Sequence, residues 1–381
     1  IKDMGFSYWQ VLPLNPPDFY GSPYASNAAF AISYLFIDPR GLVRDGLVKE
    51  EELARSLYHG SPYTADFEFA ANSRLELLKL AFSRISPEIH TKIEEFCNAH
   101  PWCEAYTLYE AAKERFGGKP WYAWDEPFAR YETAVQHARD LKAAQDFFKF
   151  VQYTAFTQWR EIKQYANENG VKILGDMPIY VSFDSADVWE NRQLFEIDDR
   201  TFIRKRVSGV PPDYFSEDGQ LWGNPLYDWV AMRKDNYRWW CERIRAALQL
   251  YDTVRIDHFR AFASYWAVPA DSDTAKNGVW EKGPGKALFD EVENELGEVP
   301  IVAEDLGVFG EDVVKLLEDT KFPGMRVIQF GFEPDADSTH LPHNYPRNCL
   351  AYVSTHDNNT LLAWLWEADD YHRRYALDYC G

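Results

Sequence analysis

The sequence has little that would serve a metal centre, a disulfide framework or a membrane. Only five of its 381 residues are cysteine, and they are scattered without CxxC or Cys/His spacing, which argues against a zinc site or structural disulfides. No apolar run reaches the roughly 18 residues of a transmembrane helix. Lys and Arg number 40 against 60 Asp and Glu, a net charge of −20. This balance argues against a general attraction to nucleic acid or to anionic membranes.

Aromatic residues, by contrast, are abundant. They make up 16% of the chain, with 14 Trp and 23 Tyr, within a hydrophobic content of 46%. Many lie beside Gly, Pro, Asn or Asp in stretches typical of loops. Flat apolar faces next to polar groups suit sugar rings, although a large core also uses aromatic residues. The composition therefore favours a large globular domain and leaves a neutral, carbohydrate-like partner as one interpretation.

Short apolar runs alternate with helical patterns along much of the chain. Apolar spacing near 3.6 residues predicts helices, among them 237–250 and 311–320, between successive runs. This alternation is typical of a parallel sheet with crossover helices. The runs that predict strands are 8–14, 171–181, 252–259, 299–307, 324–332 and 349–358.

The region between the first two predicted strands is helical. The predicted helices there are 48–58, 65–85, 87–99, 104–115 and 128–170, the last ending at Gly170, a residue typical of a helix C-terminus. No strand pattern interrupts them. We therefore interpret 41–145 as a helical insertion subdomain within a barrel domain that comprises 1–40 and 146–381.

Charged residues gather at the carboxyl ends of the predicted strands. They are Asp176, Asp257, Glu304 and Asp357. An α/β barrel builds its active site from this edge of its strands. On the run "VRID", side chains alternate with period two, so Arg255 and Asp257 are expected on the same face. The pattern predicts that Asp257 points into the mouth of a barrel.

Each of these residues also has a structural interpretation. Arg255 and Asp257 could form a buried ion pair without any catalytic role. "AEDLG" alone is typical of a helix start, and "THDN" alone of a polar turn. His258 and His343 could be histidines that only stabilise the fold. Three carboxylates at three separate strand ends are harder to explain as accidents.

Eight motifs together resemble one known family. The sequence resembles the amylomaltases, or 4-α-glucanotransferases, across nearly its whole length, with the motifs in the family's order. They are "WQVLPL", "SPYASNAAFA", "GDMPIYVSFDSADVW", "GVPPDYFSEDGQLWGNPLYDW", "VRIDHFRAF", "VAEDLG", "HLPHNYP" and "STHDNNT".

The resemblance implies both a fold and a reaction. The fold is an α/β protein, a TIM (β/α)8 barrel of the α-amylase type with helical insertions. The reaction is the transfer of an α-1,4-glucan segment to a glucose or maltodextrin acceptor, with retention and through a covalent glucosyl-enzyme. No metal or cofactor is expected, nor a nucleic acid or membrane partner; protein partners stay open. An α-1,4-glucan hydrolase or debranching relative is the alternative, and a non-catalytic glucan-binding protein ranks below it.

The resemblance assigns the reaction to three carboxyl groups. Asp257 is expected to be the nucleophile, Glu304 the general acid/base and Asp357 the stabiliser of the transition state. A retaining mechanism independently requires two carboxyls about 5 to 5.5 Å apart. Arg255 should keep Asp257 ionised, whereas Glu304 among other carboxylates should be easier to protonate. His356 is expected beside Asp357 as a hydrogen-bonding group.

Two loops and one further histidine are expected to contact substrate. The loop 204–228 is expected to act as a lid that keeps water from the glycosyl-enzyme. The resemblance places Tyr24, in the "SPY" turn, in the donor subsite, and His343 is a further candidate. The lid residues expected to stack on or hydrogen-bond to sugar rings are Asp213, Tyr214, Phe215, Gln220, Trp222 and Asn224.

Compared with the family, the chain is expected to be truncated at both ends. About six of eight barrel strands are expected, arranged as one open, curved parallel sheet whose edges are the runs 8–14 and 349–358. Asp257 and Glu304 should then end neighbouring strands, and Asp357 should lie on an exposed edge. A cytoplasmic location is expected, with a plastid location left open.

Overall fold

Six parallel strands form the centre of the molecule. The computed structural model describes residues 1–18, 21–212, 216–307, 310–332 and 337–381. Hydrogen-bonded ladders join four of the strands in the order β1-β2-β5-β8 and the other two as β10-β9. The strands are β1 (Tyr8–Gln10), β2 (Lys172–Met177), β5 (Thr253–Ile256), β8 (Ile301–Ala303), β9 (Gly324–Val327) and β10 (Cys349–Tyr352).

The two faces of these strands have different environments. On β5, Val254 and Ile256 pack into the main core under the helices, while Arg255 points to the other side, where its Nε lies 3.3 Å from the Met325 sulfur of β9. Because side chains alternate along a strand, the neighbouring strands also direct side chains to this inner face, on the side away from the helices. It contains a second apolar cluster of Leu174, Val302 and Met325, against which Leu306, Leu350 and Tyr352 pack.

The arrangement of the six strands differs in one respect from the single sheet that the sequence predicts. All six predicted strands occur, each shorter than its apolar run, but the ladders divide them into four and two. Between β8 and β9, the Ala303 amide donates to the Pro323 carbonyl at 2.9 Å. In a parallel ladder the return bond to Ala303 would come from the Met325 amide, which instead donates to Asp305 Oδ1 at 2.5 Å, so the contact forms no ladder. Side chains of β2 and β10 nevertheless meet in the inner cluster, so the strands follow a curved arc.

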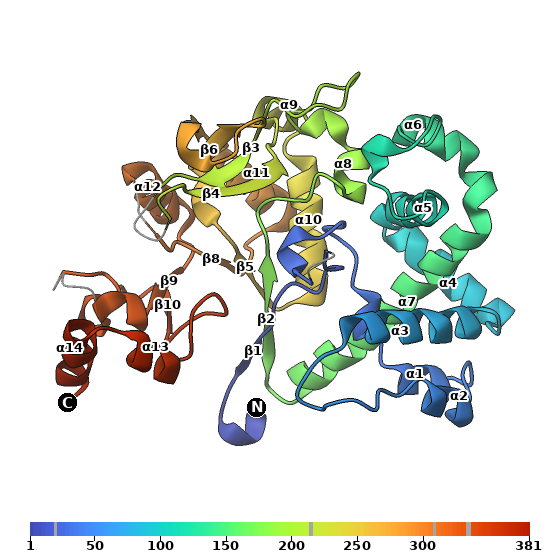
Figure 1. The fold of residues 1–381 in the computed structure, drawn as a ribbon, viewed down its shortest axis with the longest axis horizontal. Coiled ribbons are helices and arrows are strands. Elements are labelled where there is room, and N and C mark those ends of the chain that lie inside the picture. Colours follow the sequence, from blue (N-terminus) through green and yellow to red (C-terminus); the bar gives the residue numbers. More distant parts are fainter. Residues whose placement is uncertain (19–20, 213–215, 308–309, 333–336) are drawn as a thin grey trace.

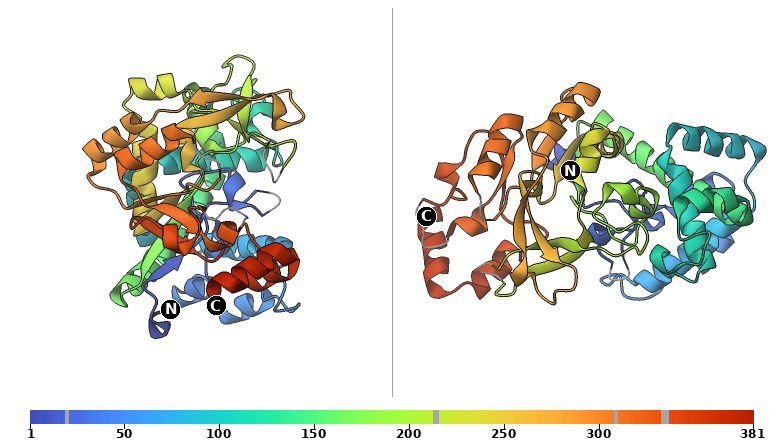
Figure 2. Two further views of the ribbon diagram at one scale, coloured as in Figure 1. Left: turned by 90° about the vertical axis from the view of Figure 1, so that its left-hand side faces the viewer. Right: turned by 90° about the horizontal axis from the view of Figure 1, so that it is seen from above.

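A second, antiparallel sheet was not predicted from the sequence. Its order is β4-β3-β6-β7, and its first two strands lie within the predicted lid loop 204–228. Figure 2 shows these strands, green to orange, in the middle of the molecule when it is seen from above. They are β3 (Arg206–Val210), β4 (Gln220–Pro225), β6 (Ser264–Pro269) and β7 (Val279–Lys282).

Between β1 and β2 the chain is helical, as the sequence predicts. The prediction of one helix over 128–170 was wrong in its first part, where α6 and a 3-10 turn precede α7. In Figure 1 the helices α3 to α6 lie to the right of the parallel strands. The helices are α1 (Pro39–Arg44), α2 (Glu50–Arg55), α3 (Phe67–Phe82), α4 (Pro87–Ala99), α5 (Trp102–Arg115), α6 (Tyr131–Ala134) and α7 (Lys142–Glu168).

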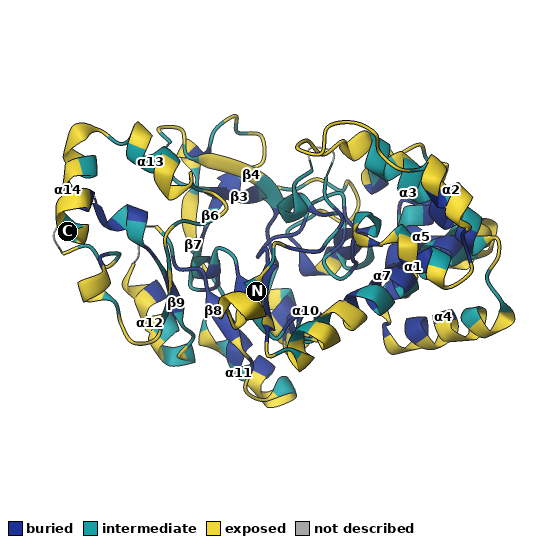
Figure 3. Cartoon of the chain, turned by 90° about the horizontal axis from the view of Figure 1, so that it is seen from below, coloured by how far each residue is buried: buried dark blue, intermediate teal, exposed yellow. Residues whose placement is uncertain are grey.

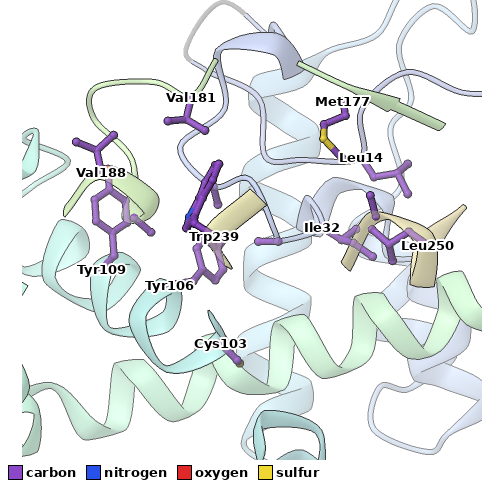
Figure 4. Close-up of a cluster of buried hydrophobic side chains, with 14 of the residues drawn as sticks. Leu14, Ile32, Cys103, Tyr106, Tyr109, Met177, Val181, Val188, Trp239 and Leu250 are labelled. Carbon is purple, nitrogen blue, oxygen red and sulfur yellow. The ribbon is translucent and has the colours of Figure 1, made fainter. Parts of the chain in front are cut away.

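One apolar core runs from these helices into the barrel. In Figure 4, Tyr106 and Tyr109 of α5 face Trp239 and Val188, which belong to later segments of the chain. Tyr109 is fully buried, and its ring lies 5.9 Å from that of Trp189. The insertion therefore packs on the barrel through its most buried aromatic residues.

The remaining helices follow the later strands. In Figure 1, α12 to α14 lie on the left of the strands, and Figure 3 shows α14 largely exposed, whereas β8 is buried. Within the described residues, no helix is both long and apolar enough to cross a membrane. These helices are α8 (Ala186–Glu190), α9 (Trp229–Lys234), α10 (Arg238–Leu250), α11 (Lys286–Leu296), α12 (Glu311–Thr320), α13 (Leu361–Glu367) and α14 (Asp370–Cys380).

Candidate active site

Arg255 and Asp257 meet at the carboxyl end of β5. Arg255 Nη2 donates to Asp257 Oδ1 at 2.8 Å, which confirms that the two side chains share one face of the strand. The Arg255 side chain is 2% exposed and that of Asp257 is 29% exposed. The guanidinium is therefore fixed inside the barrel, while the carboxylate remains accessible at its end.

Asp176 holds the other edge of the same guanidinium. Arg255 Nη1 lies 2.7 Å from both Asp176 oxygens, and the Asp176 side chain is fully buried. The Tyr24 hydroxyl donates to Asp176 Oδ2 at 2.6 Å. The buried structural ion pair is thus Arg255 with Asp176, and Arg255 uses its remaining edge to orient the accessible Asp257.

Glu304 lies directly beside this group, after β8, the strand paired with β5. Its Oε2 accepts the His258 amide proton at 2.7 Å, and its Oε1 accepts that of Leu306 at 2.6 Å. The residue is 8% exposed. The prediction that Asp257 and Glu304 end neighbouring strands is confirmed, because the segment that carries Asp257 contacts the Glu304 carboxyl itself.

The two carboxyl groups differ in acidity. Burial raises the pKa of Asp257 to about 6, while the nearby Arg255 lowers it and Asp176 raises it. Burial also raises the pKa of Glu304, to about 8, and the negative charge of Asp257 raises it further. Arg255 therefore acts in the predicted direction on Asp257, although burial outweighs it. Near pH 7 the arrangement favours an ionised Asp257 next to a protonated Glu304.

Asp357 joins this group through His356 and Tyr24. His356 Nε2 lies 2.9 Å from the Tyr24 hydroxyl and 3.3 Å from Asp357 Oδ1. The Tyr24 and His356 rings are stacked, with centroids 5.3 Å apart. Asp357 is the most exposed of the three carboxylates, at 68%, in agreement with its expected place on an exposed edge.

The antiparallel sheet brings part of the predicted lid to this site. Trp222 of β4 packs edge to face on His258, with centroids 4.7 Å apart, and its Nε1 donates to Gln220 at 3.1 Å. The Asn224 amide instead holds the sheet together, donating to the Val181 carbonyl at 3.0 Å and accepting from Ser208 at 3.2 Å. The predicted contacts of Asp213, Tyr214 and Phe215 lie outside the described residues.

His343 is placed apart from this network. Its Nδ1 lies 2.8 Å from the Tyr379 hydroxyl of α14, and the two rings are 5.7 Å apart. Among the contacts of the described residues, none joins His343 to the three carboxylates. Its observed neighbours fit the structural interpretation better than the substrate-binding one.

A comparison with known proteins decides the family. The family model described as 4-alpha-glucanotransferase matches residues 1–381. The chain belongs to the 4-α-glucanotransferase family. It is 44% identical over 378 residues to the 4-alpha-glucanotransferase of Streptococcus pneumoniae, which covers 98% of this chain and 75% of that relative. It is 42% identical over 386 residues to the enzyme of the same name from Aquifex aeolicus, covering 100% of this chain and 78% of that relative.

A solved structure of the same family has the same fold. The amylomaltase from Streptococcus agalactiae, in complex with acarbose, superimposes with a TM-score of 0.94 at 36% identity, over 98% of this chain and 76% of that one. This match confirms the α-amylase-type barrel with helical insertions that the sequence predicts. The chain therefore shares its fold with that amylomaltase over nearly its whole length.

Asp176 is the residue that the sequence-based site did not include. It lies at a strand end, as Asp257 and Glu304 do, so the signal was present. Its spacing alone did not show that Arg255 would bind it on one edge and Asp257 on the other. Within the described residues, no group of three or more His, Cys, Asp and Glu side chains is arranged to hold a metal ion.

Proposed function

We propose that this 4-α-glucanotransferase transfers an α-1,4-glucan segment to a glucose or maltodextrin acceptor, with Asp257 as nucleophile, Glu304 as general acid/base and Asp357 as transition-state stabiliser. The observation that carries this proposal is the pairing of an accessible, Arg255-bound Asp257 with a buried Glu304 on the neighbouring strand. A retaining double displacement requires one ionised and one protonated carboxyl side by side.

In the first step, Asp257 attacks the anomeric carbon of the donor. Glu304 donates its proton to the oxygen of the departing glucan, so the bond breaks without releasing an alkoxide. Arg255, which donates to Asp257 at 2.8 Å, limits the rotation of the attacking carboxylate. Its second partner, Asp176, keeps the guanidinium from following Asp257 toward the substrate.

In the second step, the acceptor hydroxyl replaces the departed glucan. Glu304, now ionised, takes the acceptor proton while the acceptor oxygen attacks the glucosyl-enzyme. The two amides that donate to Glu304 stabilise this ionised form. Asp357, with His356 beside it, is suited to accept hydrogen bonds from the hydroxyls of a distorted sugar.

Transfer in place of hydrolysis requires that the site favour a sugar over water. Trp222 offers a flat apolar surface, 38% exposed, packed on His258, the residue whose amide donates to Glu304; an acceptor ring could stack there and displace water. We assign this role to Trp222. Gln220, which accepts a hydrogen bond from Trp222, is assigned a supporting part in it. Asp213, Tyr214 and Phe215 belong to the same proposed lid.

One incubation tests the proposed function. The protein is mixed with maltotriose and the products are separated by chain length. A ladder of longer maltodextrins together with free glucose is expected. Maltose and glucose without a ladder would show a hydrolase, and unchanged maltotriose would show a glucan-binding protein, so either result would overturn the proposal.

We further propose a cytoplasmic location. The five cysteines are free thiols, and the Cys97 and Cys103 sulfurs lie 3.3 Å apart without a bond between them. Unbonded thiols at this distance are typical of a reducing compartment. Fractionation of the native host, followed by detection of the protein, tests the location.

A further inference from the structure

His258 has a backbone conformation that most residues avoid. It directly follows Asp257, and its φ of 51° and ψ of 45° place it in the left-handed region. For a residue other than glycine this conformation is unfavourable, because the side chain approaches its own backbone. A conformation of this kind at an active site points to a role that the surrounding contacts maintain.

The turn at His258 redirects the amides that follow Asp257. The Asp257 amide donates to the Met177 carbonyl of β2 at 2.9 Å. The amides of His258 and Phe259 both turn to the opposite neighbour, donating to the side-chain and backbone oxygens of Glu304 at 2.7 and 3.1 Å. In a continued strand these two amides would point to opposite sides. The left-handed turn therefore fastens the Asp257 segment to Glu304.

These contacts fix the plane of the Glu304 carboxyl. One oxygen is held by the Leu306 amide, which belongs to the same segment as Glu304, and the other by the His258 amide. Two donors on different oxygens restrict rotation of the carboxyl about its last bond. Of these two donors, the His258 amide is the one that relates this orientation to the position of Asp257.

The side chain of His258 faces the antiparallel sheet. Its ring meets the Trp222 ring nearly at a right angle, with an interplanar angle of 80° and centroids 4.7 Å apart. The Trp222 ring also packs against the Tyr180 ring, with centroids 6.2 Å apart. Burial, and then the charge of Arg260, lower the pKa of His258 to about 3. The imidazole is therefore neutral at ordinary pH and serves as a packing surface for Trp222.

We propose that His258 is a positioning residue that couples the seating of Trp222 to the orientation of the Glu304 carboxyl. Its amide holds the carboxyl, and its ring rests on the tryptophan of the sheet that borders the site. Displacement of Trp222 removes the support of the ring and loosens the turn that aims the amide. This inference rests on the proposed role of Glu304 as general acid.

Two substrates separate positioning of the acid from general damage. Cleavage of maltotriose needs a proton on the departing sugar, whereas fluoride leaves α-maltosyl fluoride with little need for an acid. The value of kcat/KM for each substrate reports the first bond-breaking step. The ratio of kcat/KM for the fluoride to that for maltotriose therefore rises when the acid is misplaced, and stays constant when the whole site is damaged.

Two substitutions separate the backbone of His258 from its ring. His258→Ala removes the ring and disfavours the left-handed conformation, whereas His258→Gly removes the ring and accepts that conformation freely. We expect the ratio of kcat/KM values to rise about 30-fold in His258→Ala, which loses both the ring and the favoured backbone conformation. In His258→Gly, which loses only the ring, we expect a rise of less than tenfold. Equal ratios in the two variants, or a ratio unchanged in both, would overturn the proposal.

Trp222→Ala tests the coupling when it is made both in the wild type and in His258→Gly. Loss of sugar stacking on Trp222 would raise the same ratio equally in both backgrounds, so we expect a rise at least threefold larger in the wild type, where the His258 ring is present. The matched control is Trp280→Ala, which removes a partly exposed tryptophan of the same sheet that packs on Trp266 and Arg260; its ratio should equal that of the wild type. If Trp222→Ala and Trp280→Ala give the same ratio, the coupling is refuted, even if the His258 variants fail to fold.

Glu304→Gln distinguishes failure of this inference from failure of the proposed function. If Glu304 is the acid, this variant loses several orders of magnitude in kcat/KM for maltotriose and keeps most of its kcat/KM for α-maltosyl fluoride. A Glu304→Gln variant that loses both equally would refute the proposed role. If the ratio of kcat/KM values rises in Glu304→Gln but not in His258→Ala, the role of His258 is refuted and that of Glu304 is kept.

Discussion

The Tyr24 hydroxyl donates to Asp176 at 2.6 Å, although 152 positions separate the two residues in the chain. Between them lies the whole helical insertion. The bond attaches the loop after β1 to the carboxyl end of β2, and through Asp176 to Arg255 and Asp257. Asp257, the proposed nucleophile, is therefore held by a chain of contacts that begins outside its own strand.

Asp176→Asn should weaken both the fold and the control of Asp257. The change leaves the buried Arg255 guanidinium without one of its two carboxylates, and we expect a loss of about 3 to 5 kcal/mol in the free energy of unfolding. Because Asp176 raises the pKa of Asp257, the acidic limb of the activity profile should move to lower pH. Denaturant unfolding and kcat/KM against pH measure the two effects.

Tyr24→Phe should cost less stability than Asp176→Asn and serves as its comparison. It removes one hydrogen bond to Asp176 and leaves the ion pair with Arg255, so a loss of about 1 kcal/mol is expected. Equal stability losses in the two variants would contradict the account of Asp176 as the main anchor of Arg255.

Activity should depend on pH as a bell-shaped curve. The reaction needs Asp257 ionised, which requires a pH above its pKa of about 6, and Glu304 protonated, which requires a pH below its pKa of about 8. The value of kcat/KM for maltotriose should therefore rise through pH 6, peak near 7 and fall through 8. With α-maltosyl fluoride the fall at alkaline pH should disappear. A maltotriose profile that stays flat above pH 7 would show that Glu304 does not supply the proton.

Asp257→Asn should abolish turnover while the fold is kept. The amide oxygen can still accept from Arg255, so the side chain keeps its place, but it cannot form the glucosyl ester. We expect a loss on the order of 10⁴ to 10⁶ in kcat, with maltodextrin binding retained in calorimetry. Turnover within tenfold of the wild type would remove Asp257 from its assigned role.

Glu110→Gln should change how stability depends on pH. Glu110 accepts from the Asn27 amide at 2.8 Å at the contact of insertion and barrel, and burial raises its pKa from 4.5 to about 7. The native state therefore holds this proton longer than the unfolded chain. Its stabilising effect is complete below pH 4.5 and is lost as the pH rises to about 7.

Glutamine at position 110 does not ionise, so the variant does not lose stability as the pH rises. The melting temperature of Glu110→Gln should match the wild type near pH 4.5 and exceed it above pH 7. Glu114→Gln, on the exposed face of the same helix, is the matched control and should follow the wild type throughout. A melting difference for Glu110→Gln that does not vary with pH would contradict this assignment.

The sequence predicts the parallel strands and the positions of the carboxylates at their ends well, for a physical reason. Buried strands are short continuous apolar runs, and polar residues that end them, such as Asp257 and Glu304, interrupt that pattern clearly. The antiparallel sheet was missed because its strands are not uniformly apolar: on β4, Gln220, Leu221 and Trp222 are all exposed. No period-two pattern marks such a strand.

The contacts within the site were harder to foresee than its members. Alternation along β5 predicts that Arg255 faces Asp257, since this depends only on local geometry. The second partner, Asp176, depends on the register between β2 and β5, in which Asp176 lies opposite Arg255. The left-handed turn at His258 likewise depends on contacts with Glu304 and Trp222, which no local sequence pattern records.

The apolar core that runs from the helical insertion into the barrel has a consequence for modularity. Tyr109 and Trp189 bury one another across the two parts, so neither part can expose its half of the contact without a large cost in apolar hydration. The insertion and the barrel should melt together in a single cooperative transition. Excision or transplantation of 41–145 would leave both pieces prone to aggregation, and variation among relatives in this region should be confined to its outer faces.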